Sequence, residues 1–154
     1  MVEIVIAISV ISVFSLIALN VAQKSIVVSN RSVHTTQAAY LLEEGVESVR
    51  IFRDNNTWTN FLNLFNSSYT YCLPEEVASW KSSLSTTLPC SKIGIFTRTI
   101  NVEDVNRDTS SGDIVSSGGS FDNGTKLFTI TVSWQEGGNT LNKVLKFYIN
   151  DLFS

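Results

Sequence analysis

Residues 1–22 read MVEIVIAISVISVFSLIALNVA, and Glu3 is the only charged side chain among them. From Ile4 to Ala22 the sequence contains no Asp, Glu, Lys, Arg or Pro. The hydrocarbon core of a bilayer is about 30 Å thick and requires about 20 helical residues to cross. We therefore expect residues 4–22 to span a membrane as a helix.

Two other interpretations of this apolar stretch stay open. A signal peptide carries basic residues before its apolar core and a small-residue cleavage site after it. Here no Lys or Arg precedes the apolar run, and no clear cleavage site follows it. A buried core helix is the second alternative, but the uninterrupted apolar length favours a membrane span. Glu3 is expected to need a partner, because a carboxylate at the edge of a membrane segment is costly.

Helical periodicity continues beyond the apolar run, most clearly in QAAYLLEEGVESVRIFRD (residues 37–54). Apolar and small residues recur there at spacings of three and four, which predicts an amphipathic helix. Asp54-Asn55-Asn56 then ends the pattern. One helix is predicted from about residue 2 to about residue 53, and at 1.5 Å per residue it would be roughly 75 Å long. The residues on its apolar face are Ala38, Leu41, Leu42, Gly45, Val46, Val49 and Phe52.

The C-terminal part of the chain alternates as β-strands do. KLFTITVSW (residues 126–134) is the clearest example, because Phe128, Ile130, Val132 and Trp134 share one face. IGIFTRTINV (residues 93–102) is a second predicted strand, and residues 143–149 are a third, returning after a turn at QEGGNTLN. Residues 103–125 are predicted to be a polar loop. This antiparallel meander has one apolar face that needs a cover, and the amphipathic helix is the natural candidate.

The region between helix and meander has weaker signals. Residues 58–65 suggest a short helix, residues 69–73 a short strand, and residues 74–80 another helical turn. We therefore predict an α+β fold, in which a long N-terminal helix packs on an antiparallel sheet of about three to four strands. The predicted divisions are residues 1–22 as the membrane half of the helix, 23–54 as its amphipathic half, and 55–154 as a globular head.

Composition and cysteine content narrow the function. The chain has 154 residues, a net charge of −3 and 16% charged residues, with no basic cluster of the kind that binds nucleic acid. Its two cysteines, Cys72 and Cys90, have 17 residues between them. We expect them to pair, since the residues after the membrane span have the character of an exported domain. Two buried free thiols are the alternative.

These features together resemble those of a known protein family. The stretch VEIVIAISVISVFSLIALNVAQKS (residues 2–25) is similar to the N-terminal cleavage and methylation segment of type IV pilins and of the pseudopilins of type II secretion. QAAYLLEEGVESVRIFRD resembles the helix continuation of minor, prepilin-like proteins. TRTINV and TITVSWQEGG resemble the sheet ends of the same group. The resemblance covers most of the chain but is specific only in its N-terminal third.

The resemblance implies a role for Glu3. In that family a prepilin peptidase cuts after a glycine and methylates the new N-terminal residue. The family glutamate lies five residues in from the new terminus and pairs with the terminal amine of a neighbouring subunit, and Glu3 aligns with it. Such pairing sets the register between subunits, because an uncompensated carboxylate among apolar helices costs several kcal/mol.

The resemblance also implies partners and a location. The partners are other pilin or pseudopilin subunits, the inner-membrane assembly platform and the prepilin peptidase. The location is a single-pass inner membrane protein with an extracytoplasmic C-terminal domain, and after assembly a cell-surface or periplasmic fibre. The basic leader, the cleavage glycine and the first two mature residues of the family have no counterpart here, so the resemblance implies residues upstream of Met1. Asn20 replaces a proline that many major pilins carry, which favours a minor pilin or pseudopilin.

Catalytic chemistry has little support in the sequence. His34, the only histidine, has no Cys or acidic residue at ligand spacing, and the chain has no G-x-S-x-G motif. We therefore predict no enzyme activity and no cofactor. Residues 104–113 contain alternating oxygen ligands that weakly resemble a calcium loop, although Thr109 and Val115 stand where Gly and Glu are expected. The candidate calcium ligands are Asp104, Asn106, Asp108 and Asp113.

Two functions therefore remain as hypotheses. The first is a structural subunit, either minor pilin or pseudopilin, that assembles into a fibre through its N-terminal helix. The second is a minor pilin at the tip of a pilus that binds surfaces, DNA or secreted cargo through residues 103–125. A membrane-anchored enzyme is the least favoured reading, because no catalytic constellation converges.

Overall fold

The computed structural model of this protein describes residues 2–67, 69–73, 84, 86 and 89–151. The helical turn predicted for residues 74–80 lies outside the described residues. The chain divides into two compact units, residues 1–37 and residues 38–154. The boundary between these units falls inside the long N-terminal helix, α1 (Val2–Asp54).

The first unit consists of the N-terminal part of α1. Residues 2–33 are exposed on every side of this helix, including the apolar side chains from Val2 to Val28. Residues 4–22 are apolar on every side, and such a surface is stable in lipid or against other apolar surfaces rather than in water. Ser9, Ser12 and Ser15 do not disturb this surface, since each hydroxyl donates a hydrogen bond to a carbonyl one turn earlier.

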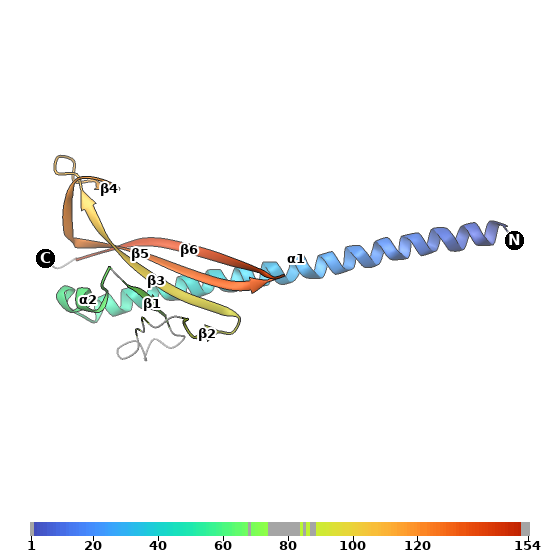
Figure 1. Ribbon diagram of the computed structural model, residues 1–154, viewed down its shortest axis with the longest axis horizontal. Coiled ribbons are helices and arrows are strands. Elements are labelled where there is room, and N and C mark those ends of the chain that lie inside the picture. The colour runs from blue at the N-terminus through green and yellow to red at the C-terminus, as the bar shows by residue number, and fades with distance from the viewer. Residues whose placement is uncertain (1, 68, 74–83, 85, 87–88, 152–154) are drawn as a thin grey trace. The chain divides into compact units, whose positions relative to one another are not determined.

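The second unit is an antiparallel sheet covered on one face by the C-terminal part of α1 (Figure 1). Its four main strands run in the order β1 (Thr70–Cys72), β3 (Phe96–Arg107), β5 (Ser120–Glu136) and β6 (Asn139–Asn150). Two short strands, β2 (Lys92–Ile93) and β4 (Ile114–Val115), also pair with β3. The predicted α+β class, with a long helix on an antiparallel sheet, is confirmed.

The core lies between α1 and the inner face of the sheet. The predicted apolar face of α1 is the face that is buried, with Leu41 only partly so. Gly45 lies close to the sheet, since a Cβ atom at this position would be 3.0 Å from Ile130 Cδ1. The inner face of the sheet presents alternate residues of β3 and β5, as the period of two requires. Its buried apolar members are Phe96, Ile100, Val102, Phe128, Ile130, Val132 and Trp134.

One charged residue, Arg98, also lies on this inner face and is fully buried. Its guanidinium donates a hydrogen bond to the carbonyl of Leu41 at 2.9 Å and forms an ion pair with Glu44 at 3.3 Å. Glu44 is on α1, so the arginine joins the sheet to the helix through both main chain and side chain. A buried guanidinium requires such partners, because an unpaired charge is very costly away from water.

A short helix, α2 (Trp58–Leu64), closes one end of this core. Thr57 caps its first turn by accepting a hydrogen bond from the amide of Asn60. Phe61 and Phe65 then join Phe52 and Phe128 in an aromatic cluster with ring-centroid separations of 5.1–6.3 Å. The short helix and the short strand predicted before the meander are both confirmed, as α2 and β1.

Three boundaries predicted for the meander are wrong. The expected strand at residues 93–102 is interrupted at Gly94, whose φ of 61° places it in a turn between β2 and β3. The expected eight-residue turn after β5 is a two-residue hairpin, Gly137-Gly138, because both glycines adopt positive φ. The expected polar loop at 103–125 is mostly strand: β3 continues to Arg107, β4 follows, and β5 begins at Ser120.

Candidate assembly helix and binding arm

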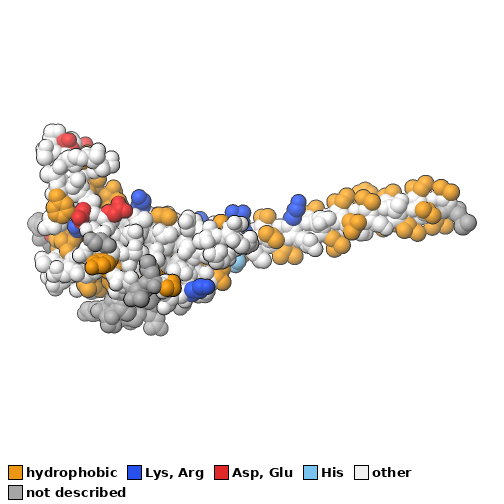
Figure 2. Space-filling view, in the orientation of Figure 1, with side chains coloured by type: hydrophobic (Ala, Val, Ile, Leu, Met, Phe, Trp, Pro, Cys, Tyr) orange, Lys and Arg blue, Asp and Glu red, His pale blue; other side chains and the backbone are white. Residues whose placement is uncertain are grey.

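The N-terminal part of α1 is the first candidate functional surface. Figure 2 shows hydrophobic side chains distributed along its visible face. By length and composition, α1 can cross a membrane. The 18-residue apolar stretch on which this rests has no buried residue. A membrane anchor is therefore the coarse role that this helix supports, since its apolar side chains are available to lipid.

Glu3 lies in the first turn of α1 and is exposed. No residue in the described part of the chain forms an ion pair or a hydrogen bond with its carboxylate. Its position in the first turn is favourable in one respect, because the amide groups at a helix N-terminus carry partial positive charge. A carboxylate in an otherwise apolar stretch remains available to a cation from another molecule.

Cys72 and Cys90 form a disulfide, as predicted, with their Cα atoms 5.3 Å apart. Cys72 is the last residue of β1, a three-residue strand at the edge of the sheet, and pairs with Thr99 of β3. The bond therefore ties this short strand to the segment that leads into β2. Both cysteines are buried, which fits a structural bond.

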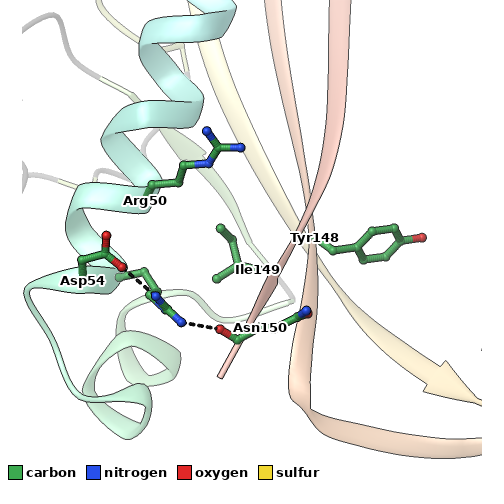
Figure 3. A pocket seen from close by; sticks show the side chains of 6 residues that line it. Arg50, Asp54, Tyr148, Ile149 and Asn150 are labelled. Atoms are coloured by element: carbon green, nitrogen blue, oxygen red, sulfur yellow. Dashed lines mark hydrogen bonds and ion pairs between the residues drawn. The ribbon is translucent and has the colours of Figure 1, made fainter. Parts of the chain in front are cut away.

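A shallow pocket of about 290 Å³ lies where the end of α1 meets β6 (Figure 3). Arg53 crosses it and donates hydrogen bonds to the Asp54 carboxylate at 2.7 Å and to the Asn150 carbonyl at 2.9 Å. Arg50 is paired with Glu47 at 2.6 Å. Both guanidinium groups therefore already have carboxylate partners. We interpret the pocket as a packing gap between helix and sheet rather than a binding site.

The segment predicted as the loop 103–125 forms the second candidate surface. Beyond Asp104 the register of β3 with β5 shifts, and Val105 pairs with Asp122. A bulge of this kind bends the strand that carries the extra residues, and Figure 1 shows β5 bending sharply here. We call residues 105–122 the arm; it contains the end of β3, β4 and the start of β5.

Arg107 holds the arm in shape. Its guanidinium donates to the Asp122 carboxylate at 2.6 Å, to the Thr125 hydroxyl at 3.1 Å and to the Gly112 carbonyl at 2.9 Å. The hydrogen bond from the Thr125 hydroxyl and that from Arg107 lower the pKa of Asp122. The arm is thus built from strands and is held by the polar contacts of Arg107. Its composition, rich in Ser, Gly and Asp, does not predict strands.

The tip of the arm is a turn built on Asp108. Its carboxylate accepts hydrogen bonds from the hydroxyl and amide of Ser110 and from the amide of Ser111. These bonds, that from the Ser110 hydroxyl first, lower the pKa of Asp108 to about 2. The carboxylate therefore serves its own turn, as Asp does in many short loops.

The four candidate calcium ligands are not brought together into one site. Asp104 accepts from the ammonium of Lys126 at 2.5 Å and from the Ser67 hydroxyl at 3.3 Å, whereas Asp108 faces its own turn. Asn106 pairs with Val115 inside the arm. Within the residues that the structure describes, no three His, Cys, Asp or Glu side chains are placed to hold a metal ion.

Sequence reasoning missed Arg98, Arg107 and Lys126 as structural residues. Arg98 and Lys126 lie in stretches that were predicted as strands from their apolar alternation, and Arg107 lies in a polar stretch that was predicted as a loop. The partners of each are distant in sequence. Comparison of the chain with protein-family models, with curated proteins and with solved structures found no match.

Proposed function

We propose that this protein is a structural subunit, a minor pilin or pseudopilin, of a type IV pilus-like or type II secretion fibre. The N-terminal part of α1 holds the subunit in the inner membrane before assembly and enters the core of the fibre afterwards. The second unit forms the extracytoplasmic surface. The subunit has no catalytic step, and its work is polymerisation by helix packing, with Glu3 setting the register.

The observation that carries this proposal is the change of character along one continuous helix. Residues 2–33 of α1 are exposed on all sides, whereas its last turns are buried against an antiparallel sheet. Lipid tails are as apolar as the side chains of a neighbouring helix, so burial alone does not favour a fibre over a membrane. Assembly therefore needs a specific contact, and Glu3 is the one carboxylate in the apolar stretch that can provide it.

The proposal is tested by Glu3→Ala in the organism that makes the protein. We expect the variant to reach the membrane in normal amount but to be depleted at least tenfold from the sheared fibre fraction, since tenfold corresponds to about 1.4 kcal/mol. Glu43→Ala is the matched control, because Glu43 lies on the exposed side of α1, and it should assemble normally. Equal incorporation of the two variants would remove the role of Glu3.

The N-terminal mass of the protein from source membranes, expressed from its native locus, is a second test. The proposal, together with the upstream leader that the resemblance implies, requires a trimmed and N-methylated terminus two residues before Met1. An unmodified terminus at Met1 would instead leave a membrane-anchored domain and no assembly mechanism based on Glu3.

A second candidate function is binding at the tip of such a fibre, and the arm is the feature that favours it. The arm projects beyond the bulge and exposes Phe121 and Ile114 while Arg107 keeps it ordered. Deletion within residues 109–119 should then leave fibres intact and abolish adhesion or uptake. Loss of stability alone, without loss of binding per folded subunit, would count against this candidate.

A further inference from the structure

A pocket of about 520 Å³ lies at the angle between the arm and the outer face of the sheet, the face opposite α1. Its volume falls in the range of small-ligand sites, roughly 300–1,000 Å³. Glu103, Leu127 and Tyr148 form its floor and are direct neighbours across β3, β5 and β6. Its wall comes from the arm, with Asn106, Ile114, Val115 and Ser116. We call it the elbow pocket.

Tyr148 offers an aromatic surface in the elbow pocket. Figure 3 shows its ring projecting from β6 away from α1, whereas Ile149 points toward the helix. Tyr148 is 49% exposed. Its hydroxyl makes no hydrogen bond to any residue that the structure describes. An aromatic ring beside Leu127, outside the core, is available to pack on the apolar face of a ligand.

Two charged side chains of the pocket, Glu103 and Lys146, also lack partners among the described residues. The neighbouring charged side chains are already in other ion pairs, since Asp104 pairs with Lys126 and Arg107 pairs with Asp122. Glu103 can only accept hydrogen bonds when ionised, and Lys146 can only donate them. The pocket thus presents one acceptor and one donor of opposite charge, and its net charge is close to balanced.

These groups exclude several classes of ligand. A purely apolar ligand would desolvate Glu103 and Lys146 without pairing them, which is unfavourable. A phosphate-rich ligand would meet the carboxylates of Glu103 and Asp104 with a single free lysine. A ligand with one apolar face and several hydroxyls satisfies all of them, because hydroxyls both donate and accept.

We propose that the elbow pocket binds a neutral oligosaccharide. The apolar face of one sugar ring packs on Tyr148 and Leu127, while its hydroxyls donate to Glu103 and accept from Lys146. The amide of Asn106 can serve in both directions. The outer face of the sheet next to the pocket continues with hydroxyl and amide side chains, which suits further sugar units; these residues are Thr99, Asn101 and Thr131.

This inference deepens the binding function of the arm and does not depend on fibre assembly. Its test uses the full chain in detergent micelles on an array of neutral and acidic oligosaccharides, followed by calorimetric titration of the best ligand. We expect neutral glycans to bind. Tyr148→Ala and Glu103→Gln should each weaken binding at least tenfold, whereas Tyr148→Phe should weaken it less than threefold. Tyr40→Ala is the matched control, since Tyr40 is an exposed tyrosine on α1 that does not line the pocket.

Several results would overturn the proposal. These are the absence of any bound neutral glycan at millimolar concentration, a preference for sialylated or sulfated glycans, and equal binding by Glu103→Gln and the unchanged protein. Saturable binding of an extended peptide at Tyr148 in place of glycans would also overturn it. If Tyr148→Ala fails to fold, the Glu103→Gln and Tyr148→Phe pair decides the outcome. Failure of glycan binding leaves the role of Glu3 untouched, so the two proposals fail separately.

Discussion

Gly45 is a residue at which α1 lies close to the sheet. A Cβ atom there would lie 3.0 Å from Ile130 Cδ1 and 3.5 Å from Arg98 Cδ. Glycine in a helix costs up to about 1 kcal/mol relative to alanine, so its presence reflects the packing requirement. The close approach also brings the Leu41 carbonyl within reach of Arg98.

We predict that Gly45→Leu lowers the free energy of unfolding by about 1–3 kcal/mol, the usual cost of overpacking a core. Ile130→Ala in the same chain should recover part of that loss, because it removes the atoms nearest to position 45. The measurement is guanidinium unfolding in detergent, followed by tryptophan fluorescence, to which the buried Trp134 contributes. Strict additivity of the two single changes would contradict the contact, since residues in contact are expected to couple.

Asp108 gives a second prediction at this scale, because its pKa is about 2 in the folded turn and 3.8 ordinarily. A carboxyl with a lowered pKa stabilises the folded state fully above its ordinary value and loses this contribution as the pH falls toward the folded pKa. The turn should therefore loosen between about pH 4 and pH 2.

Ser110→Ala removes the largest cause of that shift and should raise the pKa of Asp108 toward 3.8. The carboxyl carbon signal of Asp108 in an NMR pH titration measures this directly. Ser116→Ala lies outside the turn and should leave the titration unchanged. A Ser110→Ala protein that titrates like the original would show that the hydroxyl hydrogen bond is not formed.

At the scale of elements, the disulfide supports the shortest of the four main strands of the sheet. β1 has three residues and pairs only with β3. Cross-linking Cys72 to Cys90 closes a loop of 18 residues in sequence separation. In the chain-entropy model a loop of this size stabilises the protein by about 3 kcal/mol.

Reduction of this bond should therefore lower the guanidinium midpoint, and β1 should lose amide protection before β5. The double variant Cys72→Ser, Cys90→Ser is the control, because reductant should not affect it further. An unchanged midpoint, with both thiols shown free by mass spectrometry, would mean that β1 is held by its packing alone.

Periodicity was sufficient for the elements that bury one face. The apolar spacing in residues 38–52 and the alternation in residues 126–134 predicted α1, β5 and the surface between them. The arm was missed because its Asp, Ser and Gly composition is typical of loops, whereas its strands are held by backbone pairing and by Arg107. Neither contact has a signal in the composition: β4 pairs with β3 only seven to nine residues away, within a stretch that has the composition of a loop, and Arg107 reaches Asp122 fifteen residues further on.

The same limit applies to the candidate sites. Glu3 and the two cysteines could be singled out from the sequence, because each differs in residue type from the residues around it. Arg98 was not predicted as buried, because a charge on an inner face is expected to avoid the core and its partners, the Leu41 carbonyl and the Glu44 carboxylate, are more than 50 residues away in the sequence. The elbow pocket depends on a bulge at Asp104 that bends the sheet, and no residue type marks a bulge reliably.

At the scale of the whole molecule, the two compact units should be separable. The second unit, residues 38–154, contains the whole hydrophobic core, whereas residues 2–33 of the first are exposed. Removal of residues 2–22 deletes apolar surface that is exposed in the described part of the chain. It should therefore cost the second unit less than about 0.5 kcal/mol, the range of surface changes away from core features.

We predict that the full chain stays in the membrane pellet after a carbonate wash, whereas the variant without residues 2–22 is found in the aqueous fraction. Both should show the same guanidinium midpoint in detergent, followed by tryptophan fluorescence. Release of the full chain by carbonate would mean that α1 is not inserted in lipid. A lower midpoint for the shortened chain would mean that the first unit stabilises the second. The assignment of membrane anchoring to one part of α1 and of core packing to the other would then be wrong.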